Sequence, residues 1–497
     1  MGTATGRWVL VATVLGSGMA MLDGTVVNLA LPRMGEDLDA SFGGLQWILN
    51  GYTLTLASLI LLGGGLGDRL GRRRVFTIGA AWFTVASLLA GVAPTVEVLV
   101  AARVLQGIGG ALLTPGSLAI LQASFHHDDR ARAIGAWSGL GGVAAAIGPF
   151  LGGWLVDALS WRWIFLINLP VGIAVVVLAR QHVPESRDEQ ANGRVDAPGA
   201  VIGALALAGL TLGLSEQNWA LTAAGAAVLV TFVVVETRRA HPLLPMAVFR
   251  SSAFSGTNIV TVLLYGTMAV VFFLLGLVLQ GPLGYSPLRA GAATVPITIA
   301  MLALSARAGA LAERIGSRLP MTVGPLLVAG SLLLMTRIDE GSSYVSDVLP
   351  AIIVFGLGLT LTVAPLTATA LASVEDHLAG VASGINNAVA RTGQLLAIAA
   401  VPALAQFVPG QPVGPDDLTS GFHRVLWVGA VVLVAAAAVS WTTVGRGAPG
   451  TAEAECFHCA AGGPPPPVRQ PAAVGANRPP TDPTLSVSDP DASGRDR

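Results

Sequence analysis

The sequence predicts an all-α protein that crosses a membrane many times. Of its 497 residues, 53% are hydrophobic and only 11% are charged, whereas a soluble domain carries about 25% charged residues. The hydrophobic residues gather in long stretches, and one charged loop is repeated later in the chain. These three observations exclude an ordinary soluble enzyme and predict a polytopic helical bundle built from two similar halves.

The charged residues exclude several other classes of protein. All 28 residues in the Lys+Arg total are arginine, and the net charge is −1. Without lysine there is no Walker A loop, no Schiff-base cofactor and no protein kinase site. The arginines are scattered in short loops, which leaves no continuous stripe for a nucleic acid. We therefore expect neither a cofactor nor a nucleic-acid partner.

Fourteen stretches have the length and composition of membrane helices. A helix needs roughly 20 mostly apolar residues to cross a bilayer, and we allow one charged residue in each stretch. The stretches are 8–32, 45–66, 75–93, 98–121, 133–156, 163–179, 198–215, 219–235, 254–279, 290–311, 319–336, 348–371, 379–405 and 424–444. Arg7 and the apolar run after it also fit a signal peptide, but the helical pattern continues to Pro32 and favours a first membrane helix.

The arginines predict the orientation. An even number of spans places both termini on one side, and arginine-rich loops mark the cytoplasmic face. Sixteen arginines share the face of the N-terminus: Arg7, Arg69, Arg72, Arg73, Arg74, Arg130, Arg132, Arg180, Arg187, Arg194, Arg238, Arg239, Arg250, Arg314, Arg318 and Arg446. The other face has five: Arg33, Arg162, Arg289, Arg337 and Arg424. Both termini are therefore expected in the cytoplasm.

An internal repeat predicts the domain organisation. The loop GGLGDRLGRR from Gly64 to Arg73 recurs as GALAERIGSR from Gly309 to Arg318. Parallel repeats in one membrane chain are typical of a rocking-bundle transporter. The expected parts are a six-helix bundle at 8–179, two inserted membrane helices at 198–235 and a second six-helix bundle at 254–444.

The last segment, 446–497, differs in kind from the rest. Ten of its 52 residues are proline and it has no apolar cluster, which predicts a disordered cytoplasmic tail. Cys456 and Cys459 lie within it with the spacing of a metal-binding pair. No second ligand pair follows to complete a zinc site, so we expect no metal.

Asp23 and Arg103 are the most informative residues, because ionisable groups inside a bilayer mark functional sites. Asp23 lies about 22 Å from the cytoplasmic end of its helix and Arg103 about 21 Å from the cytoplasmic surface, at 1.5 Å per residue. The matching depths predict a pair whose attraction falls when Asp23 takes up a proton. The alternatives are a purely structural ion pair and a charge that snorkels to the surface.

Two further groups of residues suggest moving parts. Asp68, Arg69, Arg72 and Arg73 lie in the first repeated loop and could form a latch between the halves, or only orient the chain by positive charge. Small residues allow close helix contact and proline kinks a helix. A packing seam or hinge is therefore expected at Gly148, Pro149, Gly152 and Gly153.

Other polar residues carry less information. Glu216 and Glu236 fall at helix ends, where interfacial placement explains them without a function. Arg391 lies near the middle of the thirteenth stretch, and binding a substrate and packing a helix are equally open roles for it. Candidate residues of a substrate cavity are Asn50, Trp137, Asn258, Tyr265, Asn386, Asn387 and Gln394.

Five segments together resemble one known family. They are 22–32 (LDGTVVNLALP), 64–75, 99–107 with Arg103 and Gln106, 148–153 (GPFLGG) and 161–172 (WRWIFLINLPVG). They are similar to the motifs of the major facilitator superfamily, and specifically of its fourteen-helix drug:proton antiporters of the EmrB/QacA type. The resemblance implies the major facilitator fold, with proton transfer at the fourth-helix motif and export through the 148–153 motif.

The resemblance also implies a function. We expect a monomeric exporter in the bacterial cytoplasmic membrane that exchanges external protons for small amphipathic or antibiotic-like molecules by alternating access. The thirteenth helix has no acidic residue of the kind that some multidrug members use for divalent cations, which argues against dicationic drugs. The main alternative is a dedicated exporter of one endogenous metabolite, such as a biosynthesised antibiotic or a lipid precursor. An enzyme is not expected, because no His, Asp and Ser constellation appears at a membrane face.

Overall fold

The computed structural model describes residues 4–187, 196–239, 242–375, 378–408 and 411–445. These residues form helices joined by short loops, and none of them lies in a strand. The all-α fold class expected from the sequence is confirmed. The predicted tail, 446–497, with Cys456 and Cys459, lies outside the described residues.

Among the described residues, seven helices correspond to the expected first bundle: α1 (Ala4–Leu38), α2 (Phe42–Leu70), α3 (Arg72–Gly91), α4 (Val96–Ser124), α5 (His127–Ala158), α6 (Trp163–Leu166) and α7 (Asn168–His182). The stretches expected as an insertion form α8 (Ala197–Ser215) and α9 (Trp219–Arg238). The second half contains η1 (Met246–Arg250), α10 (Ser252–Gln280), α11 (Pro287–Ile315), α12 (Arg318–Met335), η2 (Tyr344–Val348), α13 (Leu349–Ala372), α14 (Ala379–Ala399), α15 (Val401–Ala405) and α16 (Pro415–Thr443).

Thirteen of the described segments are long and apolar enough to cross a membrane. They correspond to thirteen of the fourteen expected stretches, with α6 and α7 counted together as Trp163–His182. The remaining stretch, 379–405, forms α14 and α15. It is helical but less apolar, because α14 carries Asn386, Asn387, Arg391 and Gln394.

Three helices run more than four residues further at one end than the apolar pattern predicted. α1 continues past Pro32 to Leu38, α5 begins at His127 and α16 begins at Pro415. The extra turns are polar, so they fall outside an apolar stretch, yet they are favourable helix ends. In α16, two aspartates lie in the first turn, where the partial positive charge of the helix N-terminus stabilises them.

The repeated loop adopts the same backbone turn in both halves. α2 ends at Leu70 and Gly71 follows with φ 108°, while α11 ends at Ile315 and Gly316 follows with φ 83°. Only glycine adopts such angles without strain. The glycines of the repeat therefore end the second helix of each half and start the third in a new direction.

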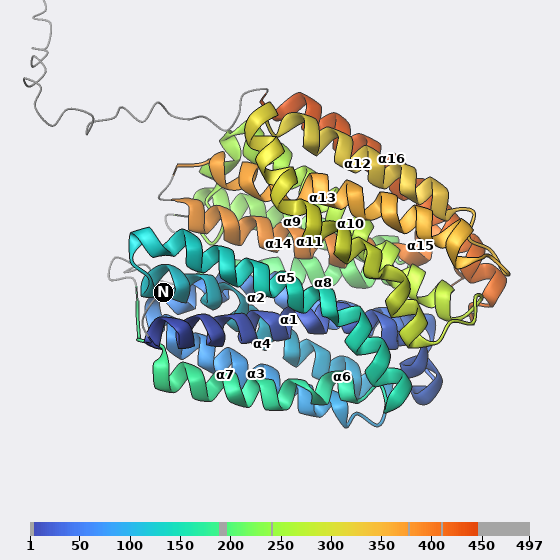
Figure 1. Cartoon of the computed structure of the whole chain (residues 1–497), viewed down its shortest axis with the longest axis horizontal. Helices are drawn as coiled ribbons and strands as arrows, with labels where there is room; N and C mark the ends of the chain where they lie inside the picture. The colour runs from blue at the N-terminus through green and yellow to red at the C-terminus, as the bar shows by residue number, and fades with distance from the viewer. Residues whose placement is uncertain (1–3, 188–195, 240–241, 376–377, 409–410, 446–497) are drawn as a thin grey trace, which may run out of the picture. The chain divides into compact units, whose positions relative to one another are not determined.

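The helices lie side by side along the long axis of the molecule (Figure 1). α3 and α7 lie along one flank and α12 and α16 along the other. The halves meet where α5 contacts α11, α2 contacts α14, and α1 contacts α10. The inserted helices pack on each other, and α8 also contacts α2 and α14. The insertion therefore covers one of the seams between the halves.

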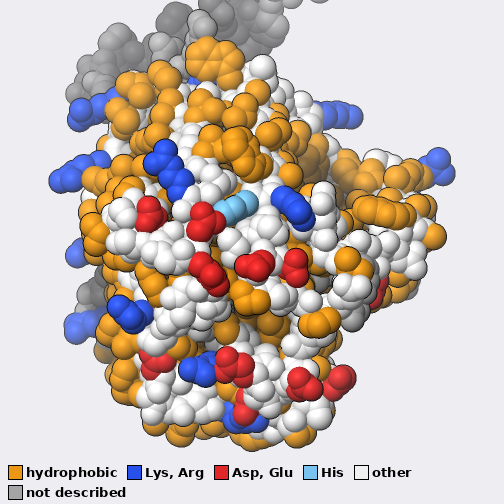
Figure 2. Space-filling view, turned by 90° about the vertical axis from the view of Figure 1, so that its right-hand side faces the viewer, with side chains coloured by type: hydrophobic (Ala, Val, Ile, Leu, Met, Phe, Trp, Pro, Cys, Tyr) orange, Lys and Arg blue, Asp and Glu red, His pale blue; other side chains and the backbone are white. Residues whose placement is uncertain are grey.

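The two ends of the bundle differ in charge. Figure 2 shows the end opposite the N-terminus, where Asp and Glu side chains gather, and we call it the acidic end. It includes Asp37 of α1, Asp157 of α5 and Asp416 of α16. The end that carries the N-terminus holds the loop with Arg69, Arg72 and Arg73, and we call it the arginine-rich end. Exposed large apolar side chains lie along the helices between the two ends, among them Trp82 and Val85 of α3 and Val431 and Val434 of α16, as a bilayer requires.

Candidate functional site

Asp23 and Arg103 are direct partners in the interior of the first half. Nη1 of Arg103 lies 2.6 Å from Oδ2 of Asp23. The side chains are 1% and 0% exposed for Arg103 and Asp23, respectively. α1 supplies the carboxylate and α4 supplies the guanidinium. The pairing predicted from their depths is present, whereas its role in proton coupling stays a prediction.

A chain of polar side chains extends this pair. Nε2 of Gln106 donates to Oδ1 of Asp23 and to the hydroxyl of Ser87, both at 2.9 Å. The amide of Asn168 donates to the same hydroxyl at 3.3 Å. Oε1 of Gln106 accepts from Nη1 of Arg103. Each buried polar group thus has a partner, which is the condition for a stable buried network.

The guanidinium of Arg103 is also held from its other sides. Its Nε donates to the carbonyl of Ile48 at 3.1 Å. Its Cζ lies 4.4 Å from the centre of the Tyr52 ring and 5.6 Å from that of Phe165. Aromatic rings attract a desolvated cation. Arg103 is therefore held by the Ile48 carbonyl and by both rings in addition to Asp23.

The sequence pointed to only part of this site. It identified Asp23 and Arg103 as its centre and Gln106 within a motif. Ser87 and Tyr52 were missed, because one sequence does not show which faces of α3 and α2 turn toward Asp23. The signal was present only as polar residues inside apolar stretches.

A second feature is a cavity of about 230 Å³, which we call the polar cavity. Its lining comes from α1, α10, α13 and α14: Met21, Tyr265, Thr367, Ala370, Leu371, Ser383, Asn386, Asn387, Ala390, Arg391 and Gln394. Four of the seven predicted cavity residues are among them. Arg391 is one of the lining residues, and its Nη1 donates to Oε1 of Gln394 at 3.1 Å.

The other three predicted cavity residues lie elsewhere. Asn258 is buried behind the lining, where its oxygen accepts from Asn386 at 3.3 Å. Asn50 is fully buried and neither of its amide atoms has a described partner. Trp137 donates to the hydroxyl of Ser17 at 3.1 Å. A polar residue in a membrane helix therefore did not by itself indicate a cavity.

α1 joins the buried pair to the polar cavity. Met21 lines the cavity and is 39% exposed, while Asp23, two residues further, is buried against Arg103. Two residues on a helix point about 200° apart. One short segment of α1 thus presents one face to the cavity and the other to the carboxylate's partners.

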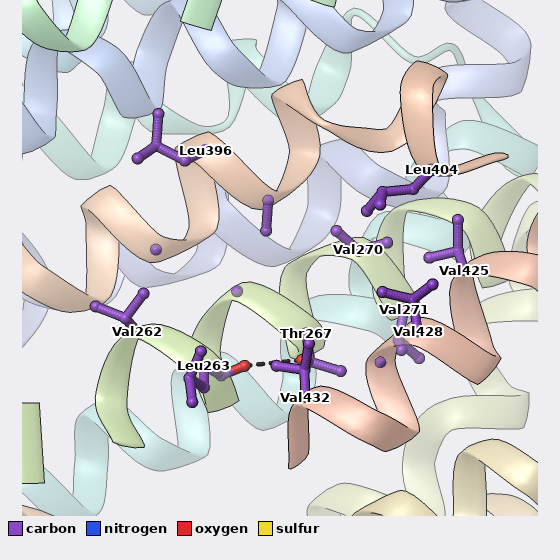
Figure 3. Close-up of a pocket in the computed structure, with 14 residues that line it drawn as sticks. Val262, Leu263, Thr267, Val270, Val271, Leu396, Leu404, Val425, Val428 and Val432 are labelled. Atoms are coloured by element: carbon purple, nitrogen blue, oxygen red, sulfur yellow. Dashed lines mark hydrogen bonds between the residues drawn. The ribbon is translucent and has the colours of Figure 1, made fainter. Parts of the chain in front are cut away.

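A third feature is an apolar cleft of about 270 Å³ between α10, α14, α15 and α16 (Figure 3). Valine and leucine side chains dominate its wall, and Thr267 carries the one hydroxyl in the lining. That hydroxyl donates to the carbonyl of Leu263 at 2.7 Å, as the dashed line in Figure 3 marks. The cleft offers little to orient a polar ligand, so the polar cavity is the better candidate for a specific site.

Comparison with known proteins decides the family. The protein-family model described as Major Facilitator Superfamily matches residues 13–398 of the chain. The chain belongs to the major facilitator superfamily. It is a multi-pass bacterial membrane transporter and not an enzyme.

Curated relatives and solved structures of this superfamily agree with the fold. The chain is 33% identical to the puromycin resistance protein pur8 of Streptomyces alboniger, over 88% of this chain and 91% of that protein. It is 34% identical to the tetracenomycin C resistance and export protein of Streptomyces glaucescens, over 80% of this chain and 75% of that protein. A crystal structure of a D-xylose–proton symporter superposes with a TM-score of 0.64 at 16% identity, covering 88% of this chain and 98% of that one.

The loop predicted as a latch contacts residues of the first half of the chain. Nη2 of Arg72 lies 2.8 Å from Oδ1 of Asp68. The backbone N–H of Arg73 donates to Oε1 of Glu185 at 3.0 Å. Arg69 is exposed. A latch between the halves stays a prediction, and Glu185, which the sequence did not single out, is the partner that such a latch would have to exchange.

The predicted hinge lies where α5 meets α1 and α11. A Cβ on Gly148 would be 2.3 Å from Oγ1 of Thr25, and one on Gly152 would be 2.5 Å from Cγ1 of Val26. A Cβ on Gly153 would be 2.6 Å from the Pro287 carbonyl oxygen. Pro149 lies inside α5. Only glycine fits these contacts, so the segment is a close seam between α5 and both neighbours, whereas its movement stays a prediction.

Glu236 lies at the end of α9, as expected, but it is only 2% exposed. Its Oε2 accepts from the backbone N–H of Leu244 at 2.8 Å, because the chain after α9 folds back over it. Beside it, Asp196 pairs with Arg239. Glu216, in contrast, is exposed as expected.

Proposed function

We propose that this transporter is a proton-coupled exporter of the fourteen-helix drug:proton antiporter type. It moves small amphipathic or antibiotic-like molecules out across the bacterial cytoplasmic membrane. The observation that carries the proposal is the buried Asp23–Arg103 pair, whose carboxylate is on α1, the helix that also lines the polar cavity. The names of the relatives as resistance and export proteins support the direction of transport.

In this proposal Asp23 takes a proton from outside and Arg103 responds to the change in charge. Protonation removes the ionic attraction at 2.6 Å, whereas Arg103 retains Ile48 and the aromatic rings. α1 is then less strongly held to α4. A site whose protonation changes the relative stability of two access states couples the proton to transport.

The contacts between the halves favour a state that is closed at the acidic end. There the amide of Gln280 donates to the Leu29 carbonyl at 3.0 Å, and Asp157 accepts from the backbone N–H of Leu288 at 2.9 Å. The polar cavity instead extends to Leu371 and Ser383, near the arginine-rich ends of α13 and α14. With both termini in the cytoplasm, a substrate would enter from the cytoplasmic side and leave after the acidic end opens. The transporter would act as a monomer, with the substrate, protons and the bilayer as its partners.

The test is gradient-driven dye transport in everted membrane vesicles that contain the full chain. Asp23→Asn is expected to abolish proton-driven transport while the purified variant still binds the dye. Asp37→Asn is the matched control, because Asp37 pairs with Arg162 at the acidic end and is half exposed. Unchanged transport by Asp23→Asn would refute the role of the carboxylate.

A dedicated exporter of one endogenous metabolite is the second candidate. It is favoured by relatives that are named for a single compound, namely the tetracenomycin C resistance and export protein and a probable actinorhodin transporter of Streptomyces coelicolor. A panel of structurally unrelated dyes and antibiotics separates the candidates. Transport of one compound class alone, with the rest ignored, supports the dedicated exporter.

A further inference from the structure

The polar cavity carries a positive charge that nothing described so far uses. Among the described residues of its lining, Arg391 is the one charged side chain. The ion pairs found in the described part of the chain do not include it. Its contact with Oε1 of Gln394 occupies one of five guanidinium N–H donors. The remaining donors are available to a molecule in the cavity.

The neighbouring polar groups are amides and hydroxyls without a negative charge, and they include further N–H donors. Because the oxygen of Gln394 accepts from Arg391, its NH₂ group is left for the cavity. Asn387 is exposed to the same space and brings a second amide. No carboxylate faces Arg391 from the described lining residues of α1, α10, α13 or α14. The wall is therefore rich in N–H donors and has a net positive charge.

We infer that the polar cavity selects amphipathic anions, with the guanidinium of Arg391 binding a carboxylate, sulfonate or phenolate group of the substrate. Charge-assisted hydrogen bonds of this kind are stronger than neutral ones, and arginine binds planar anions through two parallel bonds. The apolar lining residues Met21, Ala370 and Leu371 would hold the rest of the molecule. This inference rests on the proposed function for its direction of transport, but the binding preference can be tested without transport.

The charge of the substrate determines how much net charge one transport cycle moves across the membrane. Export of one monovalent anion in exchange for one proton moves two positive charges inward. Such an exchange is driven by the membrane potential as well as by the proton gradient. In proteoliposomes, an inside-negative potential imposed without a pH difference is therefore expected to accelerate the loss of an anionic substrate from the lumen of vesicles in which the transporter has its cellular orientation.

The experiment compares two probes that share one ring skeleton. Anilinonaphthalene sulfonate is an anion, and phenylnaphthylamine is its uncharged parent. Binding of each to the full chain in nanodiscs is measured by fluorescence and competition. The wild type should prefer the sulfonate, and Arg391→Gln should weaken sulfonate binding by about tenfold to a hundredfold while leaving the uncharged probe unchanged.

Three matched variants keep the result interpretable. Arg391→Lys retains the charge and should restore part of the preference, even if the glutamine variant folds poorly. Gln394→Ala removes a neutral donor of the wall but keeps the charge of Arg391, so it should weaken sulfonate binding less than Arg391→Gln does. Arg33→Gln changes an exposed arginine at the acidic end and should have no effect.

Equal sulfonate binding by wild type and Arg391→Gln would overturn the inference, as would an equal affinity of the wild type for both probes. A failure of this inference and a failure of the proposed function give different results. If the protein binds the sulfonate through Arg391 but transports no probe in vesicles, the anion site is supported and the proposed export function is refuted.

Discussion

Replacing Arg103 by methionine tests whether the buried pair is held by its charges. The side chain would lose its contact at 2.6 Å with Asp23, its bond to the Ile48 carbonyl and its position over the Tyr52 ring. Asp23 would keep only the amide of Gln106. Removing one partner of a buried ion pair costs about 3–5 kcal/mol, because the other charge stays buried without its counter-ion. Methionine fills much of the space, so the cavity contributes little to the loss.

The double variant Asp23→Leu with Arg103→Met separates charge from packing. Replacing both partners of a buried ion pair by apolar residues is often neutral, although Gln106 would then lose two of its three partners. Unsatisfied buried polar groups cost about 1–3 kcal/mol. The double variant should therefore recover about 2 kcal/mol of the stability that the single variant loses, while transport driven by the proton gradient is abolished in both.

The assay is thermal unfolding of the purified full chain, with vesicle transport measured in parallel. The single variant should unfold several degrees below the wild type and the double variant between them. Arg162→Met is the control, because its pair with Asp37 is exposed at 35% and 49% and such pairs contribute at most about 1 kcal/mol. A single variant as stable as the wild type, or a double variant less stable than the single one, would refute the reasoning.

Two further predictions concern the moving parts. Gly153→Ala places a methyl group 2.6 Å from the Pro287 carbonyl oxygen, so α5 must move away from α11 and the acidic end should open. Alkylation of a cysteine introduced at position 288 should then increase severalfold. Unchanged alkylation would contradict a close seam between α5 and α11. Asp68→Asn breaks a pair that is 40% exposed at the aspartate, so the free energy of unfolding should change by less than about 1 kcal/mol. A fall in vesicle transport rate at this unchanged stability would support a latch, and an unchanged rate would leave only an orienting charge.

The hydropathy pattern was sufficient to predict where the helices lie, because each helix faces lipid or the protein interior along most of its length and is therefore apolar. It was insufficient at their ends, where α1 and α16 continue into polar turns. It also did not show that Glu236 is covered, since a window along one helix does not include the segment at Leu244 that folds back over the carboxylate. These differences share one cause. The hydropathy pattern reports whether one helix is apolar, and it carries no information about which other segments of the chain pack against that helix.

The candidate site could be predicted only where the depth of a residue in the membrane is enough to identify its partner. Asp23 and Arg103 could be matched because residue number gives height along a helix, and two charges at one height in a bilayer need each other. Rotation about the helix axis is not fixed in the same way. Asn50, which turned out to be buried away from the polar cavity, and Ser87, which turned out to join the network, could not be assigned correctly without neighbouring helices.

The geometry of α1 explains how the two sites can influence each other without direct contact. Met21 forms part of the wall of the polar cavity, and Asp23 is held by Arg103 on the opposite face of the same turn. In the proposed mechanism, a substrate that contacts Met21 and a proton that binds Asp23 would therefore act on one rigid segment. Because linkage is reciprocal, binding of the substrate is then expected to change the affinity of Asp23 for a proton. Measuring proton release when a probe binds to the purified chain tests this coupling directly, and Asp23→Asn should abolish the release while the probe still binds.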